Sequence, residues 1–521
     1  MPANSEPSEQ FDPQRFSAPH EQIEELTIAR AQERMAAGDL TARQLTMMYL
    51  ERIAAMNEAG PALRAVIETN PQALEIAETL DRERAASGPR GPLHGIPVLL
   101  KDNIDTADQM QTTAGSLALA DSRPASDAFV AVRLRAAGAV LLGKANMSEW
   151  ANFRSSQSSS GWSARGGQAR NPYALERSPS GSSSGSATAV AANLALVALG
   201  TETNGSIISP AAANGVVGIK PTVGLTSRAG VIPIAHSQDS VGPFGRTVAD
   251  AAATLGALTG IDPRDDATQA SAGRGFTDYT QFLDADALRG ARIGVARETF
   301  FGYSEKSDPL AEAAIAILRS CGAEVIDPAN IPTATALRDT PAEIEVLLYE
   351  CHHDLDAYLA TRDGAVRSLE QLIAFNDAHA AAEMPFFGQD RLTAAAAKGP
   401  LTEEAYLRAL AEIRRLARGE GIDAALQAHR LDALFTLTGG PAWKIDLLNG
   451  DPSGGGGGSS GPAALAGYPI ITVPLGMVAG LPIGASFTGT AFSEPKLIAL
   501  AYAFEQATLA RTRPTYAPAI L

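Results

Sequence analysis

The sequence predicts an α/β protein. The main observation is an alternation of short apolar runs with helical patterns between residues 95 and 326. Residues 97–100 and 140–142 are apolar runs of strand type, and residues 126–138 between them have helical spacing. A second observation is that residues 341–426 are almost wholly helical in pattern. These two observations predict an α/β core that carries a helical insertion.

The length and composition are those of a large globular protein. The 521 residues are enough for one large domain or several, and 45% of them are hydrophobic. We expect residues 1–20 to be a loosely ordered arm and residues 21–521 to form a single domain. Within that domain, residues 341–426 are expected to form a helical cap.

The charge balance and the cysteines exclude several classes of function. The net charge is −16, from 42 basic and 58 acidic residues, which opposes binding to nucleic acid or to an anionic membrane. The two cysteines, Cys321 and Cys351, form no CxxC motif, so a disulfide scaffold and a zinc ribbon are excluded. We expect no metal and no cofactor, and a monomer or homodimer.

Targeting and membrane signals are absent from the sequence as read. Residues 1–10 are polar and acidic, without the charged and apolar regions of a signal peptide. The longest nearly apolar run, residues 187–199, is too short to span a bilayer. We therefore expect a cytoplasmic protein, or an exported one if a signal peptide has been removed.

The first part of the chain reads as helices around one short strand. Residues 21–58 are amphipathic; the second helix begins at Leu40 and Thr41 and has Leu45, Met48, Tyr49 and Ile53 at helical spacing. A strand over residues 65–68 and a helix over 71–87 follow. In the helix over 126–138, Ser126 is the predicted N-cap.

A long polar tract over residues 143–172 has no clear periodicity. A loop of this length inside a compact domain is usually functional or disordered. Trp150, Phe153, Trp162 and Tyr173 argue against disorder. We therefore expect the tract to pack around a site.

The rest of the chain continues the alternation. The predicted strands are residues 214–220, 231–234, 292–296, 325–326, 431–438, 468–474 and 482–489. The predicted helices outside the cap are residues 248–258, 309–319 and 494–508. The five glycines at 454–458 predict a flexible loop.

Two Ser- and Gly-rich loops, residues 180–186 and 200–210, flank an apolar run that predicts one helix and one strand. Residues 181–185 match GxSxG, with Ser183 at the nucleophile position, but that motif requires a strand just before it. Residues 175–179 are charged and end in a proline, so this interpretation fails. A Walker A loop is also excluded, because neither loop contains Gly-Lys-Ser/Thr.

Two interpretations of these loops stay open on the residues alone. Both could be tight turns of small residues whose serines act as caps. Alternatively, residues 203–206 could present several backbone N–H groups to one point, which an oxyanion hole requires. Lys101, which ends a strand-type apolar run, is either a solvated strand end or a buried base.

Short motifs containing glycine, serine and lysine stand in a fixed order along most of the chain. They are GIP at 95–97 with KDN at 101–103, TTAGS at 112–116, GKANMSE at 143–149, GSSSG at 181–185, GTETNGS at 200–206, SQD at 237–239 with GP at 242–243 and Arg246, GYP at 467–469 and GLPIG at 480–484. In this order they resemble the amidase signature family of serine amidohydrolases, over roughly residues 25–511. Among its members the chain looks most similar to the peptide amidases, partly through residues 150–155 and 161–167.

The resemblance implies a fold and a site. The fold would be a large, mixed, twisted β-sheet covered on both faces by helices. Ser206 would be the nucleophile, Ser182 a bridging serine after a cis Gly181–Ser182 peptide bond, and Lys101 the base. The N–H groups of residues 203–206 would form the oxyanion hole. The expected substrate-binding residues are Thr203, Asn204, Gly205, Ser183 and Ile208.

Elementary chemistry sets one condition on Lys101. A serine hydroxyl is a weak nucleophile until a base removes its proton, and a lysine is a base only when neutral. The pKa of Lys101 must therefore lie roughly 3 pH units below its usual value of about 10.4. Burial in a dry site lowers a lysine pKa in this way.

Three positions depart from the family pattern. Ser180 stands where glycine is usual, and we expect little effect. Ile208 stands where many members have an arginine that suits a carboxylate on the substrate, so a neutral or apolar acyl group is expected. Asn204 stands where peptide amidases have an acid, which leaves its backbone role but changes the local charge.

We therefore expect an amidase that hydrolyses a carboxamide through a serine acyl-enzyme. The expected substrate is the C-terminal amide of a peptide, with release of ammonia and the free acid. The alternative is an aryl anilide or another small amide cleaved by the same triad. Membership of a tRNA-dependent amidotransferase complex is the third hypothesis, opposed by the acidic charge and the helical cap.

Overall fold

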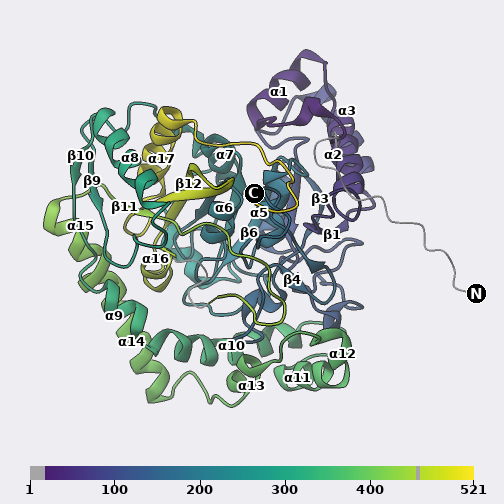
Figure 1. The fold of residues 1–521 in the computed structure, drawn as a ribbon. Coiled ribbons are helices and arrows are strands. Elements are labelled where there is room, and N and C mark those ends of the chain that lie inside the picture. The colour runs from purple at the N-terminus through teal and green to yellow at the C-terminus, as the bar shows by residue number, and fades with distance from the viewer. Residues whose placement is uncertain (1–17, 453–457, 521) are drawn as a thin grey trace, which may run out of the picture.

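The computed structural model describes residues 18–452 and 458–520 (Figure 1). Residues 1–17 of the predicted arm lie outside the described residues. So do residues 454–457 of the predicted glycine loop, of which only Gly458 is described.

A mixed sheet of 11 strands runs through the centre of the molecule (Figure 1). Its order is β1-β3-β2-β6-β8-β7-β12-β13-β11-β9-β10. Strand β2 is parallel to β3 and β6, whereas β6 and β8 are antiparallel, so the predicted mixed sheet is confirmed. Strands β4 and β5 form a separate pair. The strands are β1 Val66–Thr69, β2 Pro97–Lys101, β3 Val140–Ala145, β4 Trp162–Ser163, β5 Gly167–Gln168, β6 Val197–Glu202, β7 Val217–Lys220, β8 Ser240–Gly245, β9 Arg292–Val295, β10 Glu324–Ile326, β11 Ala433–Leu437, β12 Ile470–Val478 and β13 Leu481–Thr488.

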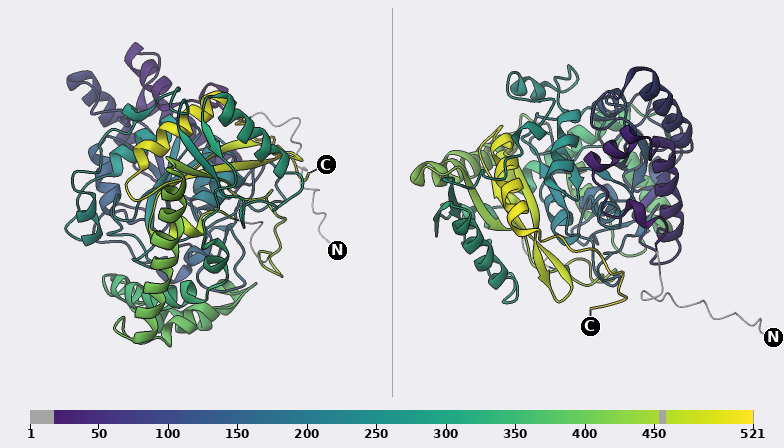
Figure 2. Two further views of the ribbon diagram at one scale, coloured as in Figure 1. Left: turned by 90° about the vertical axis from the view of Figure 1, so that its left-hand side faces the viewer. Right: turned by 90° about the horizontal axis from the view of Figure 1, so that it is seen from above.

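Helices cover both faces of this sheet (Figure 2). They are α1 Ile28–Ala37, α2 Ala42–Met56, α3 Ala73–Ser87, α4 Phe129–Ala136, α5 Ser184–Ala191, α6 Ile208–Ala213, α7 Val248–Leu258, α8 Asp308–Ser320, α9 Ala334–Asp339, α10 Ala342–Ala360, α11 Leu369–Ala378, α12 Ala380–Glu383, α13 Asp390–Ala396, α14 Glu404–Ala417, α15 Asp423–His429, α16 Gly461–Ala466 and α17 Glu494–Thr508. Successive strand residues point to opposite faces, so Phe435 packs with α7, α8 and α17, while Leu434 packs with α14, α15 and α16. None of the helices in the described part of the chain is both long and apolar enough to cross a membrane.

The N-terminal helices pack beside β1 and β3 (Figure 1). The second begins where the sequence predicts: the Thr41 hydroxyl accepts a hydrogen bond from the Gln44 N–H, and the Gln44 side chain accepts one from the Thr41 N–H. This reciprocal cap satisfies N–H groups that have no partner inside the helix. The predicted apolar positions, Leu45 and Tyr49 among them, are buried.

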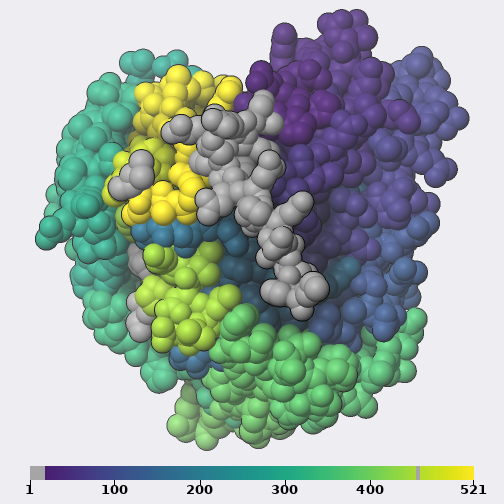
Figure 3. Space-filling model, turned by 45° about the vertical axis from the view of Figure 1, so that its right-hand side comes forward, coloured from purple at the N-terminus to yellow at the C-terminus, as the bar shows by residue number. Residues whose placement is uncertain are grey.

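The segment with the predicted cap pattern is helical from α10 to α15. Its helices lie along the lower edge of the molecule in Figure 1 and form the green surface in Figure 3. Helices α10 and α14 pack together, with the rings of Tyr349 and Tyr406 5.7 Å apart. The division of the chain into one domain with an inserted cap stays a prediction.

Three predicted elements differ from the structure. Helix α4 is capped by Ala128 and not by Ser126, because the Ala128 and Phe129 N–H groups donate to the Asp105 and Ala229 carbonyls of neighbouring loops. Residues 231–234 form no strand and contribute a single bridge from Val231 to Ile104. Strand β8 and helix α16 were not predicted, because glycine and proline interrupt both segments.

Candidate active site

Lys101 ends β2 and points into the protein interior. Its side chain is fully buried, and Nζ donates to Ser182 Oγ at 2.8 Å and to Thr201 Oγ1 at 2.8 Å. A third bond runs to the Thr201 carbonyl at 3.2 Å. The lysine is thus not a solvated strand end.

Burial lowers the pKa of Lys101 to about 7, although Asp239 and Glu202 act in the opposite direction. Desolvation disfavours the charged ammonium and no carboxylate is bonded to it directly, so the effect of burial prevails. At neutral pH a large fraction of this lysine is therefore neutral. That is the condition under which it can accept a proton from a hydroxyl group.

The first serine loop approaches its neighbours too closely for a side chain at Gly181. A Cβ there would lie 2.3 Å from Ser148 Oγ, so only glycine fits. The Gly181–Ser182 peptide bond is cis, as the resemblance implied. Ser182 is fully buried, with its hydroxyl accepting the bond from Lys101.

The second loop follows β6 and carries Ser206. Gly205 has a φ of 83°, a conformation that favours glycine. The Ser183 N–H donates to the Ser206 carbonyl at 3.2 Å, which joins the two loops. Ser206 is 9% exposed, and its hydroxyl makes no hydrogen bond to any other residue that the structure describes. The Ser182 and Ser206 hydroxyls are therefore not bonded to each other in this arrangement.

The backbone N–H groups of residues 203–206 have the arrangement expected of donors to a developing negative charge. None of the four donates to another residue within the described ranges. The loop is held from behind, because Glu202 Oε2 accepts from the N–H groups of Ile207 at 2.8 Å and Ile208 at 3.0 Å. Unbonded N–H groups on a fixed backbone can stabilise an oxyanion.

Side chains on both flanks fix the conformation of this loop. Thr203 Oγ1 donates to Asp239 at 2.5 Å. Asn204 donates from Nδ2 to Glu343 Oε1 at 2.7 Å, and its Oδ1 accepts from Ser460 Oγ at 2.8 Å. These contacts come from three distant parts of the chain, so tertiary structure decides the shape of the loop.

Two of the predicted substrate-binding side chains are fully buried. The Ser183 hydroxyl donates to the Thr201 carbonyl at 3.0 Å, and Ile208 begins α6. Both residues are structural neighbours of the loops in this arrangement. Contact of either side chain with a substrate stays a prediction.

Three residues that sequence reasoning did not single out belong to the same network. Thr201 bonds Lys101, Asp239 bonds Thr203, and Glu343 bonds Asn204. The signal for Thr201 and Asp239 was their position within the GTETNGS and SQD motifs. Glu343 lies in α10, where an acidic residue on a helix carries no signal of a site.

Two cavities adjoin the second loop. One of about 360 Å³ is lined by Asn103, Thr201, Thr203 and Asp239 together with the apolar residues 231–234. The other, of about 290 Å³, is lined by Asn204, Glu343 and Ser460. A small ligand therefore has room on either side of the loop that carries Ser206.

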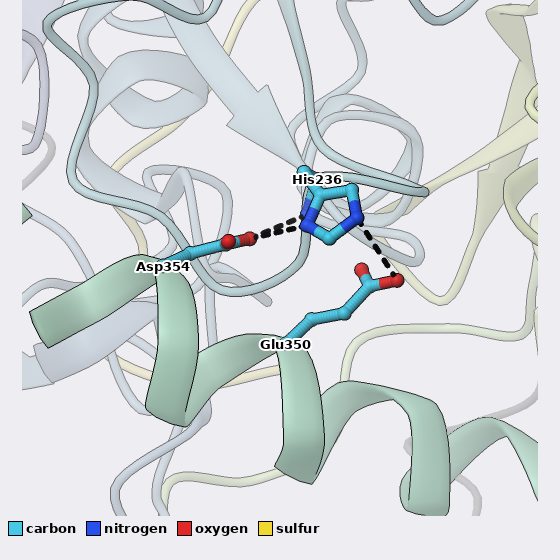
Figure 4. A group of neighbouring side chains, drawn as sticks. All are labelled: His236, Glu350 and Asp354. Atoms are coloured by element: carbon cyan, nitrogen blue, oxygen red, sulfur yellow. Dashed lines mark hydrogen bonds and ion pairs between the residues drawn. The ribbon is translucent and has the colours of Figure 1, made fainter. Parts of the chain in front are cut away.

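A histidine joins the loop before β8 to helix α10 (Figure 4). His236 Nδ1 lies 2.8 Å from Asp354, and Nε2 lies 3.5 Å from Glu350. These three residues are one of two groups in the described chain that could hold a metal ion; the other is His352, Asp356 and Glu370. Glu350 already accepts bonds from Tyr406 and from the Ser237 N–H, which favours an ion-pair link over a metal site.

Comparisons with known proteins agree with this geometry. Residues 44–498 match the family model described as Amidase. The chain is 47% identical over 510 residues to a probable amidase of Arabidopsis thaliana, covering 96% of this chain and 92% of the relative. It is 36% identical over 508 residues to a glutamyl-tRNA(Gln) amidotransferase subunit from Roseiflexus castenholzii, covering 94% and 97%.

Solved structures of peptide amidases are more similar still. The peptide amidase PAM in complex with the competitive inhibitor chymostatin has 55% sequence identity and a TM-score of 0.92, covering 95% of this chain and 99% of that one. The native peptide amidase from Stenotrophomonas maltophilia has 55% identity and a TM-score of 0.90, covering 94% and 98%.

Proposed function

The chain belongs to the amidase family and hydrolyses amide C–N bonds, and we propose that its substrate is the C-terminal carboxamide of a peptide. The products are ammonia and the free peptide acid. The reaction runs through an acyl-enzyme on Ser206, with Ser182 and Lys101 moving the proton.

One observation carries the mechanism. Lys101 is buried, has a pKa of about 7, and lies 2.8 Å from Ser182, which belongs to the loop bonded to that of Ser206. A neutral lysine in contact with a serine is a base that works near neutral pH.

Acylation begins when Ser206 Oγ attacks the carbonyl carbon of the amide. Its proton passes to Ser182 Oγ as the proton of Ser182 passes to Lys101 Nζ, which becomes an ammonium. The carbonyl oxygen takes the negative charge, which the N–H groups of residues 203–206 stabilise. Because Ser206 and Ser182 are not yet bonded, bound substrate must bring the two hydroxyls together.

The tetrahedral intermediate collapses with cleavage of the C–N bond. The leaving nitrogen receives a proton from Lys101 through Ser182, and ammonia departs. Water then attacks the ester carbonyl of Ser206, gives its proton to Lys101 by the same route, and releases the acid. Lys101 thus alternates between base and acid in each half of the reaction.

Two observations support the peptide amide as substrate. The solved peptide amidases are more similar to this chain than the amidotransferase relative is. In addition, Ile208 stands where a carboxylate-binding arginine would favour acidic substrates, so the site suits a neutral acyl group.

The test compares leaving groups side by side. Ammonia release from an amidated dipeptide is measured with purified protein, next to aniline release from the anilide of the same dipeptide. We expect kcat/KM for the carboxamide to exceed that for the anilide at least about tenfold. Equal or faster anilide cleavage would contradict the peptide-amide proposal and favour an aryl acylamidase.

A role within a tRNA-dependent amidotransferase is the second candidate, because the relative from Roseiflexus castenholzii matches over nearly its whole length. That role predicts that the protein copurifies with further subunits or tRNA. Full hydrolytic activity of the isolated chain on peptide amides would oppose it.

A further inference from the structure

The cavity of about 290 Å³ beside Asn204 has one polar end and otherwise apolar walls. The polar end is formed by Asn204, Glu343 and Ser460. The apolar walls are Phe300, Ala334, Leu337, Pro462 and Leu465. Such a lining suits a group that is apolar along its length and polar at its tip.

The polar end of this cavity is part of the loop that carries Ser206. Ser460 bonds the Asn204 side chain, and a Cβ at Gly205 would lie 3.1 Å from Ser460 Oγ. The cavity therefore starts at the proposed oxyanion hole. A substrate bound at Ser206 can extend a neighbouring side chain into it.

Glu343 gives this cavity a negative charge that no cation in the described chain neutralises at ion-pair distance. Its bonded partners are the neutral amides of Asn204, at 2.7 Å, and Gln238, at 3.4 Å. Burial raises the pKa of Glu343, while these two amides and the more distant Arg391 oppose that effect. The other cation at the cavity, Arg338, is bonded to Asp339.

We propose that this cavity is a side-chain subsite of the substrate, and that Glu343 makes it select basic over acidic side chains. A lysine or arginine side chain would lay its methylenes on the apolar walls and bring its cation to the Glu343 carboxylate. An acidic side chain would meet a like charge in a partly dry site. Glu343 is thus a specificity-determining residue, an assignment that rests on the proposed amide hydrolysis.

The test measures kcat/KM at pH 8 for three N-acetylated amino-acid amides that differ in side-chain charge: lysinamide, norleucinamide and glutamic acid α-amide. For the wild type we expect lysinamide to exceed glutamic acid α-amide at least about tenfold. Glu343→Gln should bring this ratio to within about threefold of unity while norleucinamide is still hydrolysed. The control is Glu345→Gln, on the same helix but bonded to Lys398, which should keep the wild-type ratio.

The outcomes separate this inference from the function on which it rests. If the wild type hydrolyses none of the three amides, the proposed function and the inference both fall. If it hydrolyses them but Glu343→Gln keeps the wild-type ratio, only the inference is overturned. If thermal melting shows that Glu343→Gln does not fold, Glu343→Asp replaces it; a lysinamide preference retained there supports the role of the charge, and its loss overturns it.

Discussion

Lys101 donates a hydrogen bond from Nζ to Ser182 Oγ at 2.8 Å, across a part of the protein in which both side chains are fully buried. The two residues come from β2 and from the loop before α5, and the sheet brings them together because β2 and β6 are neighbouring parallel strands. This contact places a lysine of lowered pKa beside the serine that would relay its proton. The first predictions test its consequences.

Replacing Ser206 should abolish hydrolysis without unfolding the protein. Ser206→Ala removes the only nucleophilic atom of the proposed reaction, and we expect kcat to fall at least about 10³-fold. The hydroxyl makes no hydrogen bond within the described chain, so the melting temperature should stay within about 2 °C of the wild type. Ammonia release and thermal melting measure the two effects.

The matched control is Ser183→Ala, which removes the serine at the GxSxG position. Its hydroxyl donates to the Thr201 carbonyl, so the variant should lose about 1 kcal/mol of stability and remain active. Turnover by Ser206→Ala, or complete inactivity of a folded Ser183→Ala, would show that the wrong serine has been assigned.

Activity should depend on pH through Lys101. The base must be neutral, and its pKa is about 7, so kcat/KM should rise with pH through a midpoint near 7 and level off above it. The profile is measured between about pH 5 and 9 on a substrate that does not titrate in this range. A flat profile would count against Lys101 as the base.

The charge on Asp239 should set where that midpoint lies. Asp239 is the foremost of the charges that raise the pKa of Lys101, although burial outweighs them. Asp239→Asn removes this charge, so the lysine pKa should fall further and the acidic limb should move to lower pH. Asp265→Asn is the control: its carboxylate lines the same cavity but pairs with Arg228, and the midpoint should not move. A shift to higher pH in Asp239→Asn would contradict the electrostatic account.

Lys101 should lower stability at the pH where it works. Its pKa is about 7 in the folded protein and about 10.4 when unfolded, so between these values the unfolded chain binds more protons and stability rises with pH. Lys101→Met removes this cost of about 4 kcal/mol at pH 7 but also loses bonds worth about 1 kcal/mol each. We expect an inactive variant that is more stable by about 2 kcal/mol at pH 7.

The pH dependence distinguishes this explanation from simple repacking. The advantage of Lys101→Met should shrink as pH rises from 7 toward 10, where the unfolded lysine also loses its proton. Chemical denaturation at pH 7 and pH 9.5 measures it. An advantage that is the same at both values would mean that better packing, and not deprotonation, stabilises the variant.

The link between His236 and α10 should weaken as pH rises. Burial lowers the pKa of His236, but the bond to Asp354 and the charge of Glu350 outweigh it, so the net pKa is raised. The stabilising charge is fully present below the unfolded pKa of about 6.5 and is lost as pH rises through the folded value. His236→Gln should therefore lower the melting temperature more at pH 5.5 than at pH 9.

The matched control for this prediction is His429→Gln. His429 is exposed and pairs with no carboxylate of the described chain, so its replacement should change the melting temperature equally at both pH values. A loss in His236→Gln that does not depend on pH would mean that shape alone, and not the imidazolium charge, holds the loop to α10.

Local patterns in the sequence determined most of the elements and the identity of the proposed catalytic residues. Helix α2 follows from its capping residues and apolar spacing, and α17 spans the predicted residues 494–508. Lys101, Ser182 and Ser206 lie in short motifs, so one-dimensional reading is sufficient to find them. The failures at Ser126 and at residues 231–234 occur where backbone groups of distant loops replace the local partner.

Tertiary structure alone decided how these residues act. The pKa of a lysine depends on what surrounds it, and only the packed sheet shows that Lys101 is buried beside Ser182 and Thr201. The partners of the Ser206 loop, Asp239 and Glu343, are likewise chosen by long-range packing, for which the sequence carries no local signal. The two serine-rich loops are recognisable in the sequence, but their chemistry depends on desolvation and on contacts between segments far apart in the chain.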